Sequence, residues 1–260
     1  MEFSVDGRKV FAATGGKAFD PAKPTAVFVH GAGMDHTVWT LQTRFFAHHA
    51  RNALALDLPG HGRSDGPGLT DIPAMADFLA RACAALGIEA PAVAGHSMGA
   101  LVALDFAARH RVRALALLGA AEAMPVHPKL LDAARKGDHA AIDMIAEWGF
   151  GRAAQLGGAQ APGTWMVGGG VRLLETAKGP ALADDLAACD AYKSAPAAAA
   201  ALACPALIVI GATDRMTPPA GGRALAARIA GAQTLEIAGA GHMMMVEKPD
   251  ATLDALAAIL

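Results

Sequence analysis

The stretch that decides the fold is Ala92-Val93-Ala94-Gly95-His96-Ser97-Met98-Gly99. A short apolar run leads into Gly95, and a helical pattern follows over residues 98–109. A chain that turns directly from a strand into a helix at Ser97 is strained, and it needs small residues two positions before and two after the turn. Gly95 and Gly99 meet that need. The pattern therefore predicts a sharp turn that presents a serine hydroxyl at the start of a helix.

On both sides of this turn, short apolar runs alternate with longer amphipathic stretches, which is typical of an α/β fold. Runs that are apolar on both faces indicate strands covered on both sides, as in a mostly parallel sheet. An antiparallel hairpin over Phe3–Val5 and Lys9–Ala13 is expected to precede them. The predicted parallel strands are Ala26–Val29, Ala53–Leu56, Ala92–Ala94, Val112–Leu118, Leu207–Ile210 and Leu235–Ile237.

The alternation breaks between residues 122 and 195, where helical patches and a loose glycine-rich stretch, Gly157–Gly170, contain no strand-like run. We therefore expect residues 1–121 and 196–260 to form an α/β core and residues 122–195 to form a helical insertion. The Gly157–Gly170 stretch is expected to be its most mobile part, because glycine restricts the backbone least.

Two loops carry residues that complement a serine nucleophile. Asp214 and His242 each follow a predicted parallel strand, and the carboxyl ends of such strands meet at one edge of a sheet. A serine hydroxyl needs a nearby base to remove its proton, and a carboxylate orients a histidine for that task. The sequence thus predicts a catalytic triad of Ser97, Asp214 and His242. Glu122, soon after another strand, is a rival for the acid position.

With the Gly95–Gly99 motif and a serine, an acid and a histidine in this order, the chain resembles the α/β-hydrolase family over essentially its whole length. The resemblance implies a mostly parallel eight-stranded sheet flanked by helices, with a helical lid inserted after the sixth strand. It also implies an oxyanion hole. One donor would be the main-chain N–H of Met98, and the other that of Ala32 in His30-Gly31-Ala32-Gly33.

The substrate pocket is the least defined part of the prediction. Trp148 and Trp165 in the insertion, and Met243 next to the histidine, are expected to line an apolar pocket. The alternative is that these side chains form the core of the insertion. A serine at position 97 disfavours dehalogenation, because dehalogenases of this fold use an aspartate there.

These features favour hydrolysis of a carboxylic ester, thioester or lactone of a small to medium apolar substrate, through an acyl-enzyme at Ser97. Acyl transfer or perhydrolysis through the same acyl-enzyme is the nearest alternative, and a ligand receptor of low turnover on the same fold is another. No cofactor and no metal ion are expected, because neither CxxC nor HxxxH spacing is present.

Composition excludes several classes of partner. With 22 basic and 24 acidic residues the formal charge is −2, which gives no footprint for nucleic acid or an anionic membrane. The uncharged stretch 195–213 is split by Pro205 and is better explained as a short helix followed by a strand than as a membrane span. The three scattered cysteines and the absence of a signal-like start favour a soluble cytoplasmic protein. We expect it to act on a small molecule as a monomer or a homodimer.

Overall fold

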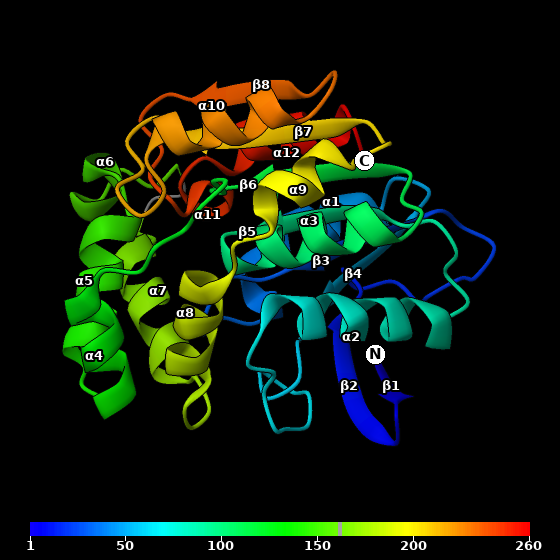
Figure 1. Ribbon diagram of the computed structural model, residues 1–260, viewed down its shortest axis with the longest axis horizontal. Coiled ribbons are helices and arrows are strands. Elements are labelled where there is room, and N and C mark those ends of the chain that lie inside the picture. The colour runs from blue at the N-terminus through cyan, green and yellow to red at the C-terminus, as the bar shows by residue number, and fades with distance from the viewer. Residues whose placement is uncertain (161–162) are drawn as a thin grey trace.

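The computed structural model describes residues 1–160 and 163–260. A single eight-stranded sheet runs through the molecule in the order β1-β2-β4-β3-β5-β6-β7-β8 (Figure 1). The strands are β1 Glu2–Val5, β2 Arg8–Ala13, β3 Thr25–Val29, β4 Asn52–Leu56, β5 Ala92–His96, β6 Ala114–Leu118, β7 Ala206–Gly211 and β8 Gln233–Ile237.

The sheet is parallel except at one side. Strands β1 and β2 form the predicted antiparallel hairpin, and β2 pairs antiparallel with β4. From β4 to β8 every neighbouring pair is parallel. The predicted α/β class and the mostly parallel eight-stranded sheet are therefore confirmed.

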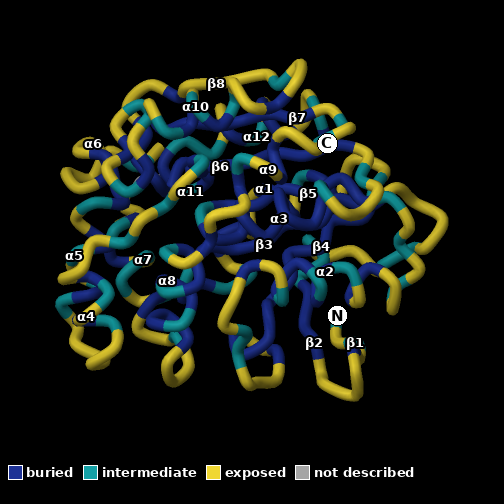
Figure 2. The backbone as a smooth tube through the Cα atoms, viewed as in Figure 1, coloured by how far each residue is buried: buried dark blue, intermediate teal, exposed yellow. Residues whose placement is uncertain are grey.

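The two faces of the sheet bury separate cores, because side chains alternate along a strand. In β3, Val27 and Val29 belong to one core while Ala26 and Phe28 belong to the other. Every residue of β3 through β7 is buried, as Figure 2 shows for the centre of the molecule. The sequence predicted this from the double-sided apolar runs.

Helices cover both faces. On one face lie α2 Ile72–Ala85, α3 Met98–Arg109, α9 Ala195–Ala200 and α10 Pro219–Arg228. On the other lie α1 Thr40–Ala47, preceded by a 3₁₀ turn at His36–Trp39, and α12 Pro249–Ala257, preceded by the short α11 Met244–Glu247. The stretch 195–213 forms α9 and β7, as expected. Within the described residues, no helix combines the length and apolarity needed to cross a membrane.

Among the described residues, five helices follow β6 before the chain returns to α9, and they gather beside one end of the sheet (Figure 1). Part of the predicted glycine-rich loop is helical, because α7 begins at Met166 and includes Gly168 to Gly170. Residues 161 and 162 of that loop lie outside the described residues. The five helices are α4 Pro128–Lys136, α5 Ala140–Gly149, α6 Arg152–Gln155, α7 Met166–Glu175 and α8 Ala181–Ala191.

Candidate active site

Ser97 occupies the turn between β5 and α3 with φ 53° and ψ −119°. A positive φ is uncommon for a residue with a side chain and persists only where the surroundings enforce it. Here the close approach of neighbouring backbone enforces it. A Cβ on Gly95 would lie 2.1 Å from the carbonyl oxygen of Gly99, and a Cβ on Gly99 would lie 2.3 Å from that of Val29. Both glycines are therefore structural requirements of the turn.

Asp214 and His242 meet at the carboxyl edge of the sheet. Nδ1 of His242 lies 2.8 Å from Oδ2 of Asp214, and the two residues are only 3% and 4% exposed, respectively. The other carboxylate oxygen accepts the main-chain N–H groups of Met216 and Thr217, each at 2.8 Å. The Thr217 hydroxyl donates to Oδ2 at 2.7 Å. These donors hold the carboxylate in one orientation toward the imidazole.

The surroundings keep Asp214 ionised. Burial favours the neutral acid, but the neighbouring His242 and the Thr217 donors outweigh it and lower the pKa of Asp214 below its usual value. A carboxylate can only accept, so Nδ1 of His242 carries the proton in this pair. Nε2 is then left as the nitrogen that can act as a base.

The rival acid lies elsewhere. Glu122 accepts a hydrogen bond from Nε of Arg228 at 2.9 Å in a partly exposed ion pair. The structure thus brings Asp214, and not Glu122, to the histidine.

Ser97 and His242 line one pocket of about 300 Å³. Ala32 and Thr217 also line this pocket, together with residues from the segment between β6 and α9. The contribution of this segment is mostly apolar, with Met124, Val126, Leu130, Ile145, Trp148 and Leu186.

Of the three side chains predicted for the pocket, the structure brings only Trp148 there. Trp165 is 69% exposed, and its ring folds against Gly168 in the first turn of α7. Met243 is 4% exposed and packs in the core on the α1 and α12 face of the sheet. The reason is geometric: Met243 precedes α11, and its main-chain N–H is directed to the carbonyl of Gly149.

The two residues predicted as oxyanion donors come from the start of α3 and from the loop after β3. Met98 is the first residue of α3, so its N–H has no partner within the helix and lies at the positive end of the helix dipole. Ala32 lines the pocket from the loop that follows β3. Gly33, next in that loop, has φ +67° and donates its N–H to Oδ2 of Asp185 at 2.8 Å.

Sequence reasoning missed several residues that support the histidine. His96, the residue before the serine, is fully buried, and its Nε2 lies 2.9 Å from the main-chain oxygen of His242. Burial and the nearby His242 hold the pKa of His96 well below its usual value, so this ring is neutral and Nε2 donates. Its position inside the Gly95–Gly99 motif was the available signal.

A second support joins the histidine loop to the end of α5. The N–H of His242 donates to the carbonyl of Gly149 at 2.8 Å. Buried Glu247 accepts the N–H of Gly151 at 2.8 Å and that of Gly241 at 3.0 Å. Burial raises the pKa of Glu247 despite these donors.

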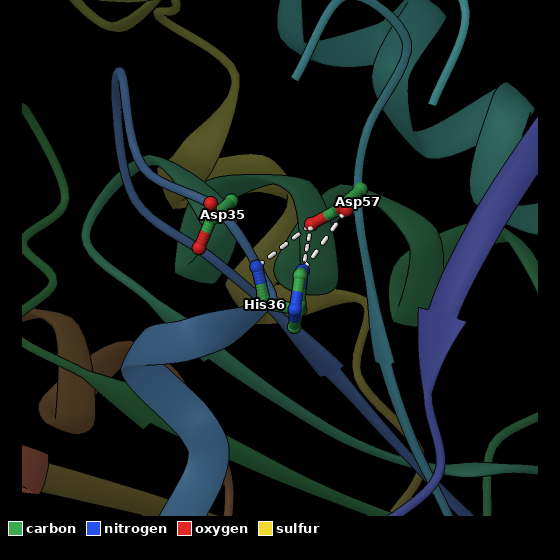
Figure 3. A group of neighbouring side chains, drawn as sticks. All are labelled: Asp35, His36 and Asp57. Atoms are coloured by element: carbon green, nitrogen blue, oxygen red, sulfur yellow. Dashed lines mark hydrogen bonds and ion pairs between the residues drawn. The ribbon is translucent and has the colours of Figure 1, made fainter. Parts of the chain in front are cut away.

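Asp35, His36 and Asp57 form a group whose donor atoms lie within 4.8 Å of one another (Figure 3). Asp57 accepts the main-chain N–H groups of His36 at 2.7 Å and Arg63 at 2.9 Å, together with Nδ1 of His36. Asp35 accepts the N–H and hydroxyl of Thr37. Hydrogen bonds within the protein thus account for this cluster, which anchors the loop after β4.

Comparison with known proteins agrees with this fold. The model of the Alpha/beta hydrolase family matches residues 26–255. The chain is 31% identical over 253 residues to a pimeloyl-[acyl-carrier protein] methyl ester esterase of Xanthomonas campestris, covering 90% of this chain and 93% of that protein. The crystal structure of the enol-lactonase from Burkholderia xenovorans LB400 superposes with a TM-score of 0.88 at 25% identity, covering 99% and 98% of the two chains.

A further relative matches only in part. The chain is 44% identical over 119 residues to the dihydrolipoyllysine-residue acetyltransferase component of the acetoin cleaving system of Cupriavidus necator. This match covers 44% of the chain and 30% of that protein, so less than a third of that relative is represented. The match to the family model over residues 26–255, the parallel sheet and the strained serine turn lead to one conclusion. The chain belongs to the alpha/beta hydrolase family and is an enzyme of the hydrolase class.

Proposed function

We propose that the protein hydrolyses carboxylic esters through an acyl-enzyme formed on Ser97. The observation that carries the proposal is the Asp214–His242 pair, joined at 2.8 Å, whose imidazole borders the same pocket as the serine. The pair supplies a histidine in the correct tautomer, and the serine turn supplies a nucleophile that adjoins a helix N-terminus.

In the acylation step, Oγ of Ser97 attacks the ester carbonyl carbon while its proton passes to Nε2 of His242. The carboxylate of Asp214 stabilises the resulting imidazolium. The N–H groups of Ala32 and Met98 donate to the developing oxyanion. His242 then returns the proton to the departing alkoxide, which leaves as the alcohol.

Deacylation repeats the step with water as the nucleophile. Water gives a proton to His242, attacks the acyl carbon, and the carboxylic acid leaves as the proton returns to Oγ of Ser97. We propose that the region over residues 122–195 acts as a cap that limits the access of other water to this site.

The pocket supports a small to medium apolar acyl or alcohol group. Its volume of about 300 Å³ and mostly apolar wall match such a group, and thioesters and lactones fit the same chemistry. The relatives support this range, since one is named a methyl ester esterase and one structure is that of an enol-lactonase.

Acyl transfer is a second candidate, favoured by the partial match to an acetyltransferase component. Both candidates share the acyl-enzyme, and they differ in whether water or another nucleophile removes the acyl group. Adding an alcohol or thiol acceptor to a reaction with p-nitrophenyl acetate would yield the transfer product only in the second case.

The test pairs labelling with turnover. A fluorophosphonate should add one mass adduct on Ser97, and short p-nitrophenyl esters should show steady release after any burst. A burst without turnover would favour a receptor of low turnover. No adduct and no burst would contradict the proposed nucleophile.

A further inference from the structure

A buried carboxylate lies on α8 outside the triad. Asp185 is 1% exposed, and its Oδ2 accepts the N–H of Gly33 at 2.8 Å. The same oxygen lies 2.9 Å from Nε2 of His61, in the loop after β4. A buried charge is strongly unfavourable unless it is paired. This carboxylate therefore joins three segments that are far apart in the chain. They are the loop Gly31–Gly33 after β3, here called the oxyanion loop, the loop after β4 that carries His61, and α8.

The hydrogen bonds of His61 define its charge. Its Nδ1 lies 3.1 Å from the carbonyl oxygen of Pro59, and its Nε2 faces the carboxylate of Asp185. A carbonyl and a carboxylate only accept, so each ring nitrogen must carry a proton. Burial opposes the charged ring, but the hydrogen bond and charge of Asp185 outweigh it and raise the pKa of His61. His61 is thus an imidazolium paired with Asp185.

The other titratable groups around His61 fit this charge. The ring of His30 packs against it at 4.8 Å between centroids. Burial, with the adjacent His61, lowers the pKa of His30 to about 4, and its Nε2 accepts the N–H of Leu58. His30 is therefore neutral. The carboxylate of Asp57 also favours the His61 cation.

The two segments that Asp185 joins, α8 and the oxyanion loop, both contribute residues to the pocket. A Cβ on Gly33 would lie 2.8 Å from Leu182, so α8 rests directly on the oxyanion loop. Leu186 and Cys189 of α8 line the pocket, as does Ala32 of the loop. One buried ion pair thus links a wall of the pocket to the segment that carries the Ala32 N–H.

We propose that Asp185 is a positioning residue, which fixes the loop Gly31–Gly33 beneath α8 by binding the Gly33 N–H and the His61 cation. The Ala32 N–H is thereby held toward the carbonyl oxygen of the substrate. This inference rests on the proposed ester chemistry for its effect on rate, while the contact itself is measurable without catalysis.

Asp185→Asn is the sharpest test, because Oδ1 of Asp185 has no hydrogen-bond partner among the described residues. The amide group can take that place while the remaining oxygen still faces Gly33. The variant thus removes the charge and little else. Asp184→Asn is the matched control, since Asp184 is the half-buried neighbour on the same helix.

Three measurements follow for D185N. The NMR titration of the His61 ring should move to lower pH, and the Gly33 amide should exchange about tenfold faster. With p-nitrophenyl acetate, kcat should fall about 10- to 100-fold, less than the roughly 10²–10³-fold loss of a whole oxyanion donor. KM should change less than about threefold, because the proposed contact positions a donor to the developing oxyanion and does not itself bind the substrate. D184N should match the wild type in all three.

The double variant H61Q/D185N guards against loss of folding, because it replaces the ion pair with two neutral amides. It should fold and still show fast Gly33 exchange. Unchanged Gly33 exchange in both variants, or an unchanged His61 titration in D185N, would overturn the positioning role. A wild type without ester turnover would instead refute the proposed function, and the exchange and titration results would still decide the role of Asp185.

Discussion

Among the described residues, two aspartate–histidine pairs have both side chains buried, and they differ in what the histidine can do. In the first, His242 binds Asp214 through Nδ1 while its ring borders the pocket. In the second, both nitrogens of His61 are bound to oxygen acceptors. The distances to the carboxylates are nearly equal, 2.8 and 2.9 Å. The Asp–His contact alone therefore does not distinguish the two histidines. They differ at the second ring nitrogen, which is engaged in His61 and has no hydrogen-bond partner among the described residues in His242.

The pairs also differ in the hydrogen-bond donors that the carboxylate has besides its histidine. Asp214 accepts two main-chain N–H groups and the Thr217 hydroxyl in addition to the imidazole. Asp185 has one main-chain donor and depends on the positive ring for the rest. The first carboxylate can thus remain charged while its histidine gains and loses a proton. The second loses its paired positive charge when its histidine is deprotonated.

The largest expected effect tests whether the unengaged nitrogen serves Ser97. Ser97→Ala should lower kcat for p-nitrophenyl esters by about 10⁴-fold or more, leaving residual catalysis by the oxyanion donors. Fluorophosphonate labelling should vanish, while the thermal unfolding profile shows a folded protein. Turnover within about tenfold of the wild type would remove Ser97 as nucleophile.

The second-largest expected effect is on kcat, and it distinguishes the carboxylates of Asp214 and Glu122 as the triad acid. Asp214→Asn should lower kcat by about 10³–10⁴-fold, because the imidazole loses its orienting charge and correct tautomer. Glu122→Gln, which alters the surface ion pair with Arg228, should change kcat less than about tenfold. Steady-state kinetics of the two variants decide the matter, and the reverse ranking would move the acid to Glu122.

The pH dependence of stability should separate the two pairs. The pKa of His61 is raised from its usual 6.5, so its stabilisation is complete below pH 6.5 and is lost as the pH rises through the raised value. The pKa of Asp214 is lowered from its usual 3.8, so its stabilisation is complete above that value and is lost as the pH falls through the lowered one. Denaturant unfolding across pH measures both.

Two variants show which pair causes the loss of stability at each end of the pH range. D185N should reduce the fall in unfolding free energy at alkaline pH, and D214N should reduce the fall at acid pH. If D185N kept the wild-type alkaline slope, the His61 cation would not be a source of stability in this range.

The smallest expected effect concerns Trp148, which lines the same pocket as His242. Trp148→Ala should shift the preference among p-nitrophenyl esters toward longer acyl chains by about tenfold in kcat/KM, since one methylene in an apolar pocket is worth roughly 1–3 kcal/mol. Trp165→Ala is the matched control and should keep the wild-type profile, because Trp165 is 69% exposed and outside the pocket lining. Equal shifts in both variants would contradict this assignment.

Much of the fold follows from the sequence because its signals are local. The double-sided apolar runs predicted the parallel strands, and the glycines around Ser97 predicted a turn whose backbone leaves no room for a Cβ. Asp214 and His242 were predicted from their place after two strands, because parallel strands bring their carboxyl ends together. In each case the signal in the sequence is a residue's place directly beside a strand or a turn.

The tertiary structure alone decided the contacts between distant segments. Nothing near Asp185 or His61 in the sequence pairs them across 124 residues; the packing of α8 on the oxyanion loop does. The same holds for Trp148 in α5, which lines the pocket, and Trp165 just before α7, which is exposed. A side chain's partners depend on helix orientation and packing, which local propensity does not encode.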